Sequence, residues 1–211
     1  MIEYWNMAPV ASIIFAITIV VSLLAFSNEE LYGKLMLHPH SVYRKVNVFQ
    51  LVTSGFIHKD WMHLFFNMLS YYFFAFQLEV YIGHWQFGVL YIASLIISDL
   101  PSVVKHKNDY WYHSLGASGA VSAAIFSFIM YSPMSEMMIM PIPFPIKAVF
   151  FGILYLIYCH FASKHARDNV NHDAHLYGAL CGVFITLILH PDVLQLFIQQ
   201  LNVGGRSMLG L

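Results

Sequence analysis

Charged residues are scarce in this chain of 211 residues: only 10% are Asp, Glu, Lys or Arg, and 59% are hydrophobic. Soluble globular domains carry about 25% charged residues. The ten basic residues are balanced by eleven acidic ones, so the chain has no basic excess to bind nucleic-acid phosphates. Low charge with high hydrophobicity also excludes intrinsic disorder. The class that remains is an integral membrane protein.

Cysteine is rare as well. Cys159 and Cys181 both lie in apolar surroundings, which favours packed thiols over a disulfide and leaves the redox compartment open. The amino terminus lacks the basic residues of a cleaved signal peptide, and its apolar run is too long for one. We therefore expect this run to be the first membrane span.

Long uncharged segments divide the sequence into candidate spans. A transmembrane helix needs roughly 20 mostly apolar residues, with about 17 at the short end. Five segments qualify: residues 4–28, 61–78, 80–98, 110–135 and 174–191. A sixth, 148–163, is shorter, but residues 141–146 extend it and Lys147 can reach the membrane surface. The sequence thus predicts an all-α membrane protein built as a bundle of six transmembrane helices.

Two further segments complete the predicted organisation. Residues 29–59, between the first two spans, are too numerous for a tight turn and too apolar for a flexible linker, so a structured loop at the membrane surface is expected. Residues 193–211 have amphipathic spacing, which is typical of a surface helix. We therefore expect a membrane domain over 1–192 followed by an amphipathic tail over 193–211.

The spans with even numbers carry unusual polar residues at their starts. With six spans, the second, fourth and sixth helices enter the membrane from the same side. Their first turns hold His63 and Asn67, the segment Gly116-Ala117-Ser118-Gly119, and His175. Polar side chains in a membrane are costly and usually face a bundle interior or a wet cavity. Because all of these residues are expected at a similar depth in the membrane, they indicate one shared site.

Ser118 lies among small residues where the fourth span begins. Glycine permits a tight turn and a close approach of a substrate backbone. The first N–H groups of a helix lack intrahelical partners, and the helix dipole favours negative charge there. The N–H groups of Ala117 and Ser118 are therefore candidates to stabilise an oxyanion, provided that a base accepts the serine proton. Small residues alone also serve close helix packing, which is the alternative interpretation.

Rows of small residues predict which helix brings the base. The sixth span has Ala174, Gly178 and Gly182 at intervals of four, and the fourth has the rows Gly116, Ala120, Ala124 and Gly119, Ala123, Ser127. Two such rows allow close backbone approach. His175 stands on the same side of its helix as Gly178, so Ser118 and His175 are expected to meet. Asp173 lies on another face, which favours a dyad over a triad.

The second span offers two more candidates. His63 and Asn67 are four residues apart and share a helix face, and both can donate hydrogen bonds. They are predicted to complete an oxyanion hole; the alternative is that they only join helices.

The histidines support a rival interpretation, a metal site, because imidazole is a common metal ligand. Five lie near the proposed face: His58, His63, His113, His172 and His175. Asp60 and Asp173 could complete the ligand set, although no His-Glu-x-x-His motif is present.

Together these motifs resemble those of the rhomboid intramembrane serine proteases. Residues 58–67 are similar to the histidine-then-asparagine pattern of the family, and Glu79 to its acidic position. Gly116-Ala117-Ser118-Gly119 looks like the Gly-x-Ser-Gly nucleophile motif, and Ala174-His175-Leu176-Tyr177-Gly178 like the Ala-His-x-x-Gly motif. The likeness covers roughly residues 61–182.

The resemblance implies that Ser118 is the nucleophile and His175 the general base, with His63, Asn67 and backbone N–H groups around the oxyanion. It implies hydrolysis of peptide bonds in or beside the transmembrane segments of single-span or multi-span membrane proteins, without a cofactor, a metal or nucleic acid. A bacterial-type inner membrane with the active site facing outward is the implied location. A catalytically silent relative that binds transmembrane segments is the alternative.

Three features depart from the family pattern. Many members have a tyrosine four residues after the nucleophile, packed on the catalytic histidine. Ser122 stands there, so His175 is expected to be held either less firmly or by another aromatic residue such as Tyr177. The Trp-Arg pair of the first loop is absent, and Tyr43-Arg44 is the nearest equivalent. The outward orientation also places most basic residues outside, against the positive-inside rule.

Overall fold

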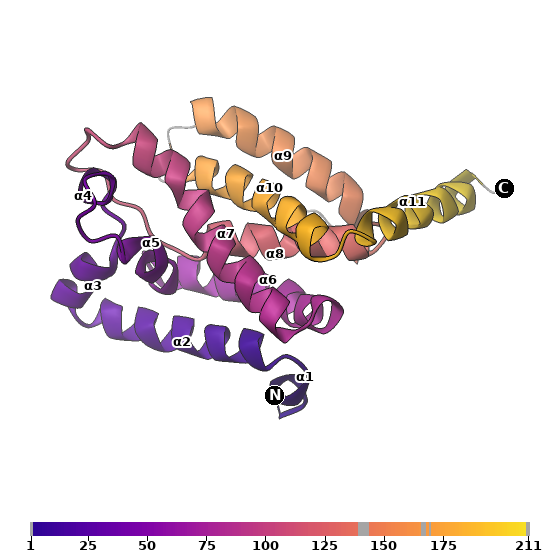
Figure 1. Cartoon of the computed structure of the whole chain (residues 1–211), viewed down its shortest axis with the longest axis horizontal. Helices are drawn as coiled ribbons and strands as arrows, with labels where there is room; N and C mark the ends of the chain where they lie inside the picture. Colours follow the sequence, from indigo (N-terminus) through magenta and orange to yellow (C-terminus); the bar gives the residue numbers. More distant parts are fainter. Residues whose placement is uncertain (1, 139–143, 166–167, 169, 210–211) are drawn as a thin grey trace.

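The computed structural model describes residues 2–138, 144–165, 168 and 170–209, and these form a helical bundle (Figure 1). The six helices that overlap the predicted spans are α2 (Pro9–Phe26), α6 (Trp61–Ile82), α7 (His84–Lys105), α8 (Ser118–Tyr131), α9 (Ala148–His165) and α10 (His172–Leu189). Each lies within or across one of the six predicted segments. The predicted all-α fold is confirmed.

Further elements precede, join and follow these six helices. The first loop holds α3 (Glu29–Leu35), α4 (Pro39–Tyr43), α5 (Gln50–Thr53) and the 3₁₀ turn η1 (Ser54–Phe56). Before α2 lies α1 (Ile2–Met7), and after α10 the chain continues as α11 (Val193–Leu209), which projects from the bundle (Figure 1). Strands β1 (Glu136–Met137) and β2 (Ile146–Lys147) pair antiparallel, with Glu136 opposite Lys147.

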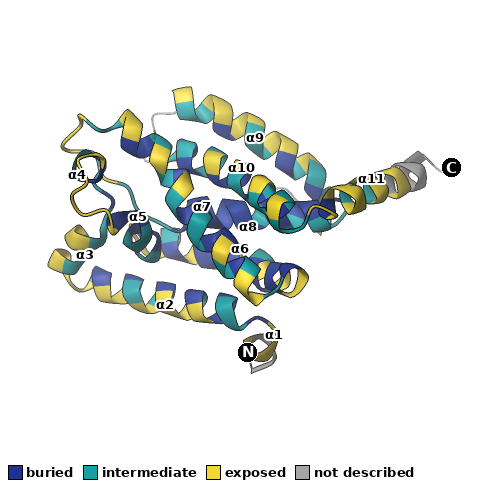
Figure 2. Ribbon diagram, viewed as in Figure 1, coloured by how far each residue is buried: buried dark blue, intermediate teal, exposed yellow. Residues whose placement is uncertain are grey.

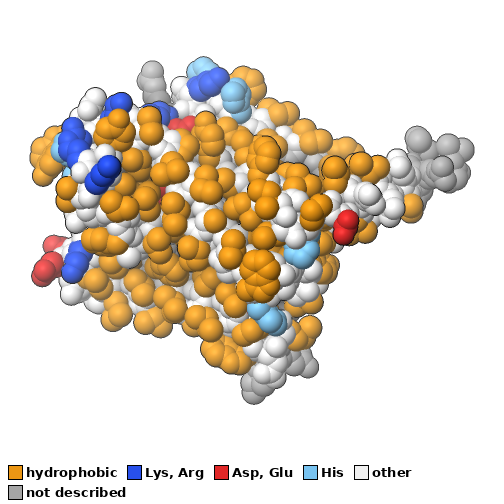
Figure 3. Space-filling view, in the orientation of Figure 1, with side chains coloured by type: hydrophobic (Ala, Val, Ile, Leu, Met, Phe, Trp, Pro, Cys, Tyr) orange, Lys and Arg blue, Asp and Glu red, His pale blue; other side chains and the backbone are white. Residues whose placement is uncertain are grey.

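Helix α8 is the centre of the bundle. It contacts α6, α7, α9, α10 and α11, and most of its side chains are buried (Figure 2). The outer helices instead expose hydrophobic side chains over much of the face that Figure 3 shows. Within the described ranges, α2, α7 and α10 are long and apolar enough to cross a membrane by length and composition. The count of six spans stays a prediction.

Several predicted boundaries were wrong, for local reasons. Of segment 110–135 only Ser118–Tyr131 is helical. Before it, Ser114 pairs with Leu37 through two backbone hydrogen bonds, and Gly116 has a φ of +114°. The segment 141–146 does not extend α9: Ile146 belongs to β2, and residues 141–143 lie outside the described part. Gly83, at a φ of +93°, ends α6, and α7 continues to Lys105 instead of ending near residue 98.

The predicted structured loop at 29–59 is confirmed as ordered secondary structure. The Gln50 side chain joins two parts of it, accepting a hydrogen bond from the His38 N–H at 3.1 Å and donating to the Lys34 carbonyl at 3.0 Å. Thr53 donates to the Leu35 carbonyl at 3.1 Å. These bonds satisfy backbone groups that a loop near apolar surroundings could not leave unpaired.

Glu79 attaches α2 to the rest of the bundle. Its fully buried carboxylate accepts hydrogen bonds from the N–H groups of Val10 and Ala11 in the first turn of α2, and lies 2.6 Å from Nδ1 of His84. A negative charge is stabilised at the amino end of a helix, where N–H groups lack partners. Glu79 therefore orients α2 against the corner between α6 and α7.

Candidate active site

Helices α8 and α10 are in backbone contact through their small residues. A Cβ added to Gly178 would overlap the carbonyl oxygen of Gly119, and one added to Gly182 would overlap that of Ala123. One turn further, the Thr186 and Ser127 hydroxyls are hydrogen-bonded to each other at 2.6 Å. The contact predicted from the small-residue rows is therefore present, and the row that faces α10 is the one that begins at Gly119.

This contact brings Ser118 and His175 to the same end of two adjacent helices. Ser118 is the first residue of α8, and His175 lies in the first turn of α10, directly after Ala174, whose carbonyl oxygen faces Gly119. Both side chains are partly accessible. They do not form a mutual hydrogen bond in this structure; such contacts commonly tighten when substrate binds.

His63 packs directly on the turn before the serine. Its ring lies over the Cα of Gly116, where an added Cβ would be 2.6 Å from Cε1 and 2.9 Å from Nε2. The N–H of Lys59 donates to its Nδ1 at 3.3 Å, so the neutral ring carries its proton on Nε2, the nitrogen beside Gly116. The Nε2–H of His63 is therefore a hydrogen-bond donor next to the start of α8.

Asn67 lies one turn further along α6 and is buried. Its amide nitrogen donates one hydrogen bond to the His63 carbonyl at 3.0 Å. Because an amide nitrogen has two protons, a second donor remains. His63 and Asn67 thus share a helix face as predicted, and Asn67 contacts the backbone of the same residue that packs on Gly116.

His58 also contacts the turn before Ser118, and the sequence did not separate it from the other histidines. The Ser22 hydroxyl uses its one proton to donate to the Phe56 carbonyl, so it must accept the hydrogen bond from Nδ1–H of His58 at 3.0 Å. Nε2 of His58 then carries no proton and accepts from the Ala117 N–H at 3.4 Å. Burial lowers the pKa of His58 to about 3, which keeps the ring neutral. The Ala117 N–H is therefore already hydrogen-bonded to His58. To donate to an oxyanion, as the sequence predicts, this N–H would have to give up its bond to His58.

Tyr155 was missed by the sequence analysis. Its ring stacks on His175 with centroids 6.4 Å apart and an interplanar angle of 21°. Its hydroxyl hydrogen-bonds to that of Ser122 at 2.8 Å. Tyr177, the expected partner, is 42% exposed and makes no such ring contact. No sequence signal links α9 to α10 here, because the contact depends on how α9 packs.

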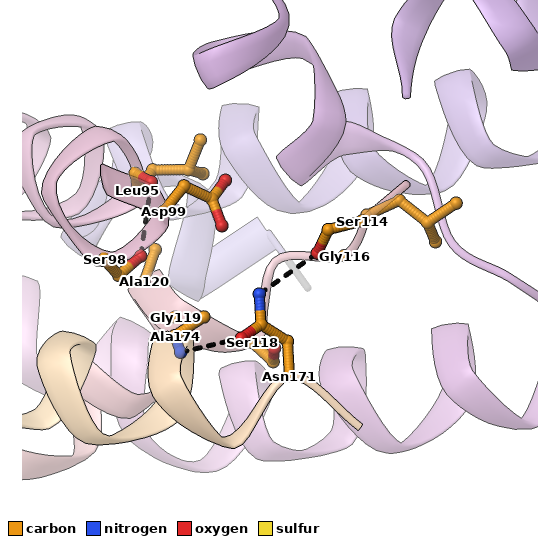
Figure 4. A pocket seen from close by; sticks show the side chains of 11 residues that line it. Leu95, Ser98, Asp99, Ser114, Gly116, Ser118, Gly119, Ala120, Asn171 and Ala174 are labelled. Carbon is orange, nitrogen blue, oxygen red and sulfur yellow. Dashed lines mark hydrogen bonds between the residues drawn. The ribbon is translucent and has the colours of Figure 1, made fainter. Parts of the chain in front are cut away.

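Asn171 connects three segments at the same level. Its side-chain oxygen accepts from the Ala174 N–H at 3.1 Å and caps α10, while its nitrogen donates to Ser114 in the loop before α8 (Figure 4). The same nitrogen donates to Ser102 on α7. An N-cap side chain that also bonds two neighbouring segments fixes the start of α10 relative to the loop that leads to Ser118.

The histidines do not form a metal cluster in the part of the chain that the structure describes, where no three His, Cys, Asp or Glu side chains are grouped to hold an ion. His113 instead stacks on His38 with centroids 4.6 Å apart, and His172 bonds to Asp168 at 3.1 Å. His58 and His63 pack edge to face. Asp60 caps α6 through the His63 N–H, and Asp173 pairs with Lys105.

A family model described as the Rhomboid domain matches residues 45–192, which is most of the chain and includes the whole site. The chain belongs to the rhomboid family. It is an integral membrane protein, as the family and its apolar helices show.

Three rhomboid relatives are similar over much of the chain. YdcA of Bacillus subtilis (strain 168), provisionally named as a rhomboid protease, is 29% identical over 149 residues, 66% of each chain. Rhomboid protein 1, mitochondrial, of Saccharomyces cerevisiae is 26% identical over 74% of this chain and 46% of its own. Rhomboid-like protein 11, chloroplastic, of Arabidopsis thaliana is 31% identical over 67% of this chain and 52% of its own. The chain thus spans about half to two thirds of the length of these relatives.

The backbone contact at Gly178 predicts a matched pair of variants. Gly178→Ala should lower the free energy of unfolding by roughly 1–3 kcal/mol, because one methyl group must separate α8 from α10. Gly88→Ala on α7 is the control, since its added Cβ would meet only Val10 at 3.6 Å. Thermal unfolding in detergent compares the two; equal stability of Gly178→Ala and the parent protein would contradict the packing.

Proposed function

We propose that this rhomboid protein is an intramembrane serine protease with Ser118 as nucleophile and His175 as general base. The observation that carries the proposal is the contact of Gly178 with the Gly119 carbonyl, since it puts the two side chains at one end of adjacent helices. No cofactor is required. The substrates are membrane proteins with one or several spans, cut in or beside a transmembrane segment within the bilayer.

The reaction follows from the groups at this level. His175 accepts the proton of Ser118 as the hydroxyl oxygen attacks the scissile carbonyl, and then donates it to the leaving amine. The Ser118 N–H, the Nε2–H of His63 and the free amide proton of Asn67 are the proposed oxyanion donors. Water then hydrolyses the acyl-enzyme with His175 again as base. Gly116 lets the His63 ring pack on the turn before the serine, Gly119 lets Ser98 on α7 and Ala174 on α10 lie close to α8, and Gly178 and Gly182 let α10 contact α8.

The first test removes each member of the dyad. Ser118→Ala or His175→Ala should lower the cleavage rate of single-span reporters in proteoliposomes by at least about a thousandfold, and the double variant should lose little more, because the pair acts as a unit. EDTA should leave the rate unchanged.

Two results would redirect the proposal. Activity that survives Ser118→Ala but is lost with EDTA would favour the metal interpretation. Reporter binding without Ser118-dependent cleavage would favour a catalytically silent rhomboid protein.

A second test concerns how His175 is held. Tyr155→Ala should lower kcat by about a hundredfold with little change in KM, since a displacement of about 1 Å at a catalytic group costs that much. Tyr155→Phe keeps the ring and should retain most activity. Tyr177→Ala is the control and should cleave normally; an equal loss in Tyr177→Ala and Tyr155→Ala would remove the special role of Tyr155.

The third test concerns orientation in a bacterial-type inner membrane, where we propose that the active site faces outward. In a background without Cys159 and Cys181, Lys105→Cys and Lys164→Cys at the active-site end should react with a membrane-impermeant thiol reagent applied from outside. Asp192→Cys, at the opposite end, should react only after the membrane is opened. The reverse pattern would support the positive-inside rule and an inward-facing site.

A further inference from the structure

The proposed base, His175, lacks an acceptor for its second ring N–H. Among the described residues its ring contacts Tyr155 on α9 and His172 on its own helix, and neither contact is a hydrogen bond. A neutral histidine that accepts the serine proton on one nitrogen already carries a proton on the other. Both N–H groups of the charged ring then need an acceptor, because a buried donor without a partner is costly.

His172 has an acceptor that no donor uses. It lies three residues before His175, so the two side chains share one side of α10. Its side chain is buried, and its Nδ1 has no hydrogen-bond partner among the described residues. The centroids of the two rings are 6.0 Å apart at an interplanar angle of 83°. Imidazole nitrogens about 2.9 Å apart put their ring centroids roughly 5 Å apart, so an approach of about 1 Å would form the bond.

Asp168 decides which nitrogen of His172 is the free acceptor. Its two carboxylate oxygens lie 3.1 and 3.2 Å from Nε2 of His172. A carboxylate only accepts, so Nε2 carries the proton of the neutral ring and Nδ1 keeps a lone pair. The Val170 N–H also donates to Asp168 at 3.1 Å, and this bond and the one from His172 hold the pKa of Asp168 below its usual range. The carboxylate is therefore charged at neutral pH.

We propose that His172 and Asp168 are positioning residues for His175, and that four side chains act in order as a relay: Ser118, His175, His172 and Asp168. The proposal rests on the proposed protease function. It places the carboxylate one ring further from the base than in a catalytic triad, where the carboxylate binds the histidine directly.

The steps of the relay balance without any further group. The Ser118 proton moves to one nitrogen of His175 as the serine oxygen bonds to the scissile carbonyl. The N–H on the other nitrogen donates to Nδ1 of His172, whose Nε2–H already donates to Asp168. No proton leaves His172, and the proton gained by His175 passes to the leaving amine when the peptide bond breaks. The new hydrogen bond stabilises the charged ring, and the negative charge of Asp168 counters its positive charge.

The charge on His175 responds to groups from several elements. A positive charge on His172 or on His63 of α6 opposes it, and the negative charge of Asp168 favours it. The other titratable groups on the packed elements are Asp99 and Lys105 on α7, Tyr155, Tyr158 and Cys159 on α9, and Asp173, which pairs with Lys105. Because Asp168 favours the charged ring, its removal should move the acid limb of the kcat/KM profile to lower pH.

The first arm of the test separates the acceptor of His172 from its packing. The ring packs edge to face on Tyr158 at 5.5 Å, and His172→Phe keeps a ring there but removes the acceptor. His172→Asn loses the ring and puts an amide oxygen near the position of Nδ1. For a single-span reporter in proteoliposomes, kcat should fall about thirtyfold in the Phe variant with KM little changed, and less than about fivefold in the Asn variant.

Thermal unfolding of the same two variants makes this arm decisive. His172→Phe should be the more stable protein and the slower enzyme. Activity that follows stability instead, with His172→Asn the slower enzyme, would make His172 a packing residue and refute the relay. Cleavage by His172→Phe at the parent rate would refute it as well.

The second arm tests the carboxylate through the pH profile. Asp168→Asn should lower kcat about threefold and move the acid limb of kcat/KM to lower pH by about half a unit, a small effect because solvent screens this half-exposed charge. Asp109→Asn is the matched control, since Asp109 lies in the loop between α7 and α8 and is equally exposed, at 49% against 48%. It should leave the acid limb in place. An equal shift in both variants would reduce Asp168 to a general surface charge and refute the relay.

A readout without cleavage separates the relay from the protease function. If the parent protein shows no Ser118-dependent cleavage, the protease function fails. NMR of ¹⁵N-histidine in Ser118→Ala protein, with the His175 signals assigned by their loss in His175→Ala, then gives the protonation midpoint of His175. A lower midpoint in both Asp168→Asn and His172→Phe supports the relay contacts, and an unchanged midpoint in either variant refutes them.

Discussion

The close approach of α8 and α10 is the constraint on which the rest of the site depends. Gly178 and Gly182 lie against the carbonyl oxygens of Gly119 and Ala123, so the two backbones touch without side chains between them. Within a bilayer, where lipid is as apolar as leucine, small residues and interhelical hydrogen bonds such as Thr186 to Ser127 hold helices together. The two first turns are thereby held at the same level.

The loops supply the second part of the arrangement. Gly116 adopts a φ that other residues rarely adopt, its N–H donates to the Ser54 carbonyl at 2.9 Å, and the His63 ring covers its Cα. His58 links the next residue, Ala117, to Ser22 on α2. The turn before Ser118 is therefore held by α2, the first loop and α6 together. A nucleophile that is fixed by backbone contacts needs little reorganisation when charge develops beside it.

Helix α9 is bound to this core more loosely. Among the residues of α9, only Ala148, Gly152 and Cys159 are buried. Within the described residues, the hydrogen bond between Tyr155 and Ser122 joins α9 to α8. The same tyrosine stacks on His175. The position of α9 and the orientation of the histidine are thus coupled through one side chain, which stands on a different helix from the tyrosine of the family pattern.

The sequence by itself determined the helical membrane class, the structured first loop, the pairing of two small-residue rows and the motifs that carry the proposed dyad. These follow from composition and from spacing along single helices, which the chain specifies locally. Only the tertiary structure decided that Tyr155 and not Tyr177 packs on His175, that the Ala117 N–H points to His58, and that Asp99 and Ser118 line the same small cavity. Each of these contacts depends on the packing of segments that are far apart in the chain. Hydrophobic periodicity also does not encode the contacts that let α7 continue past Pro101 and that shape the loop before α8.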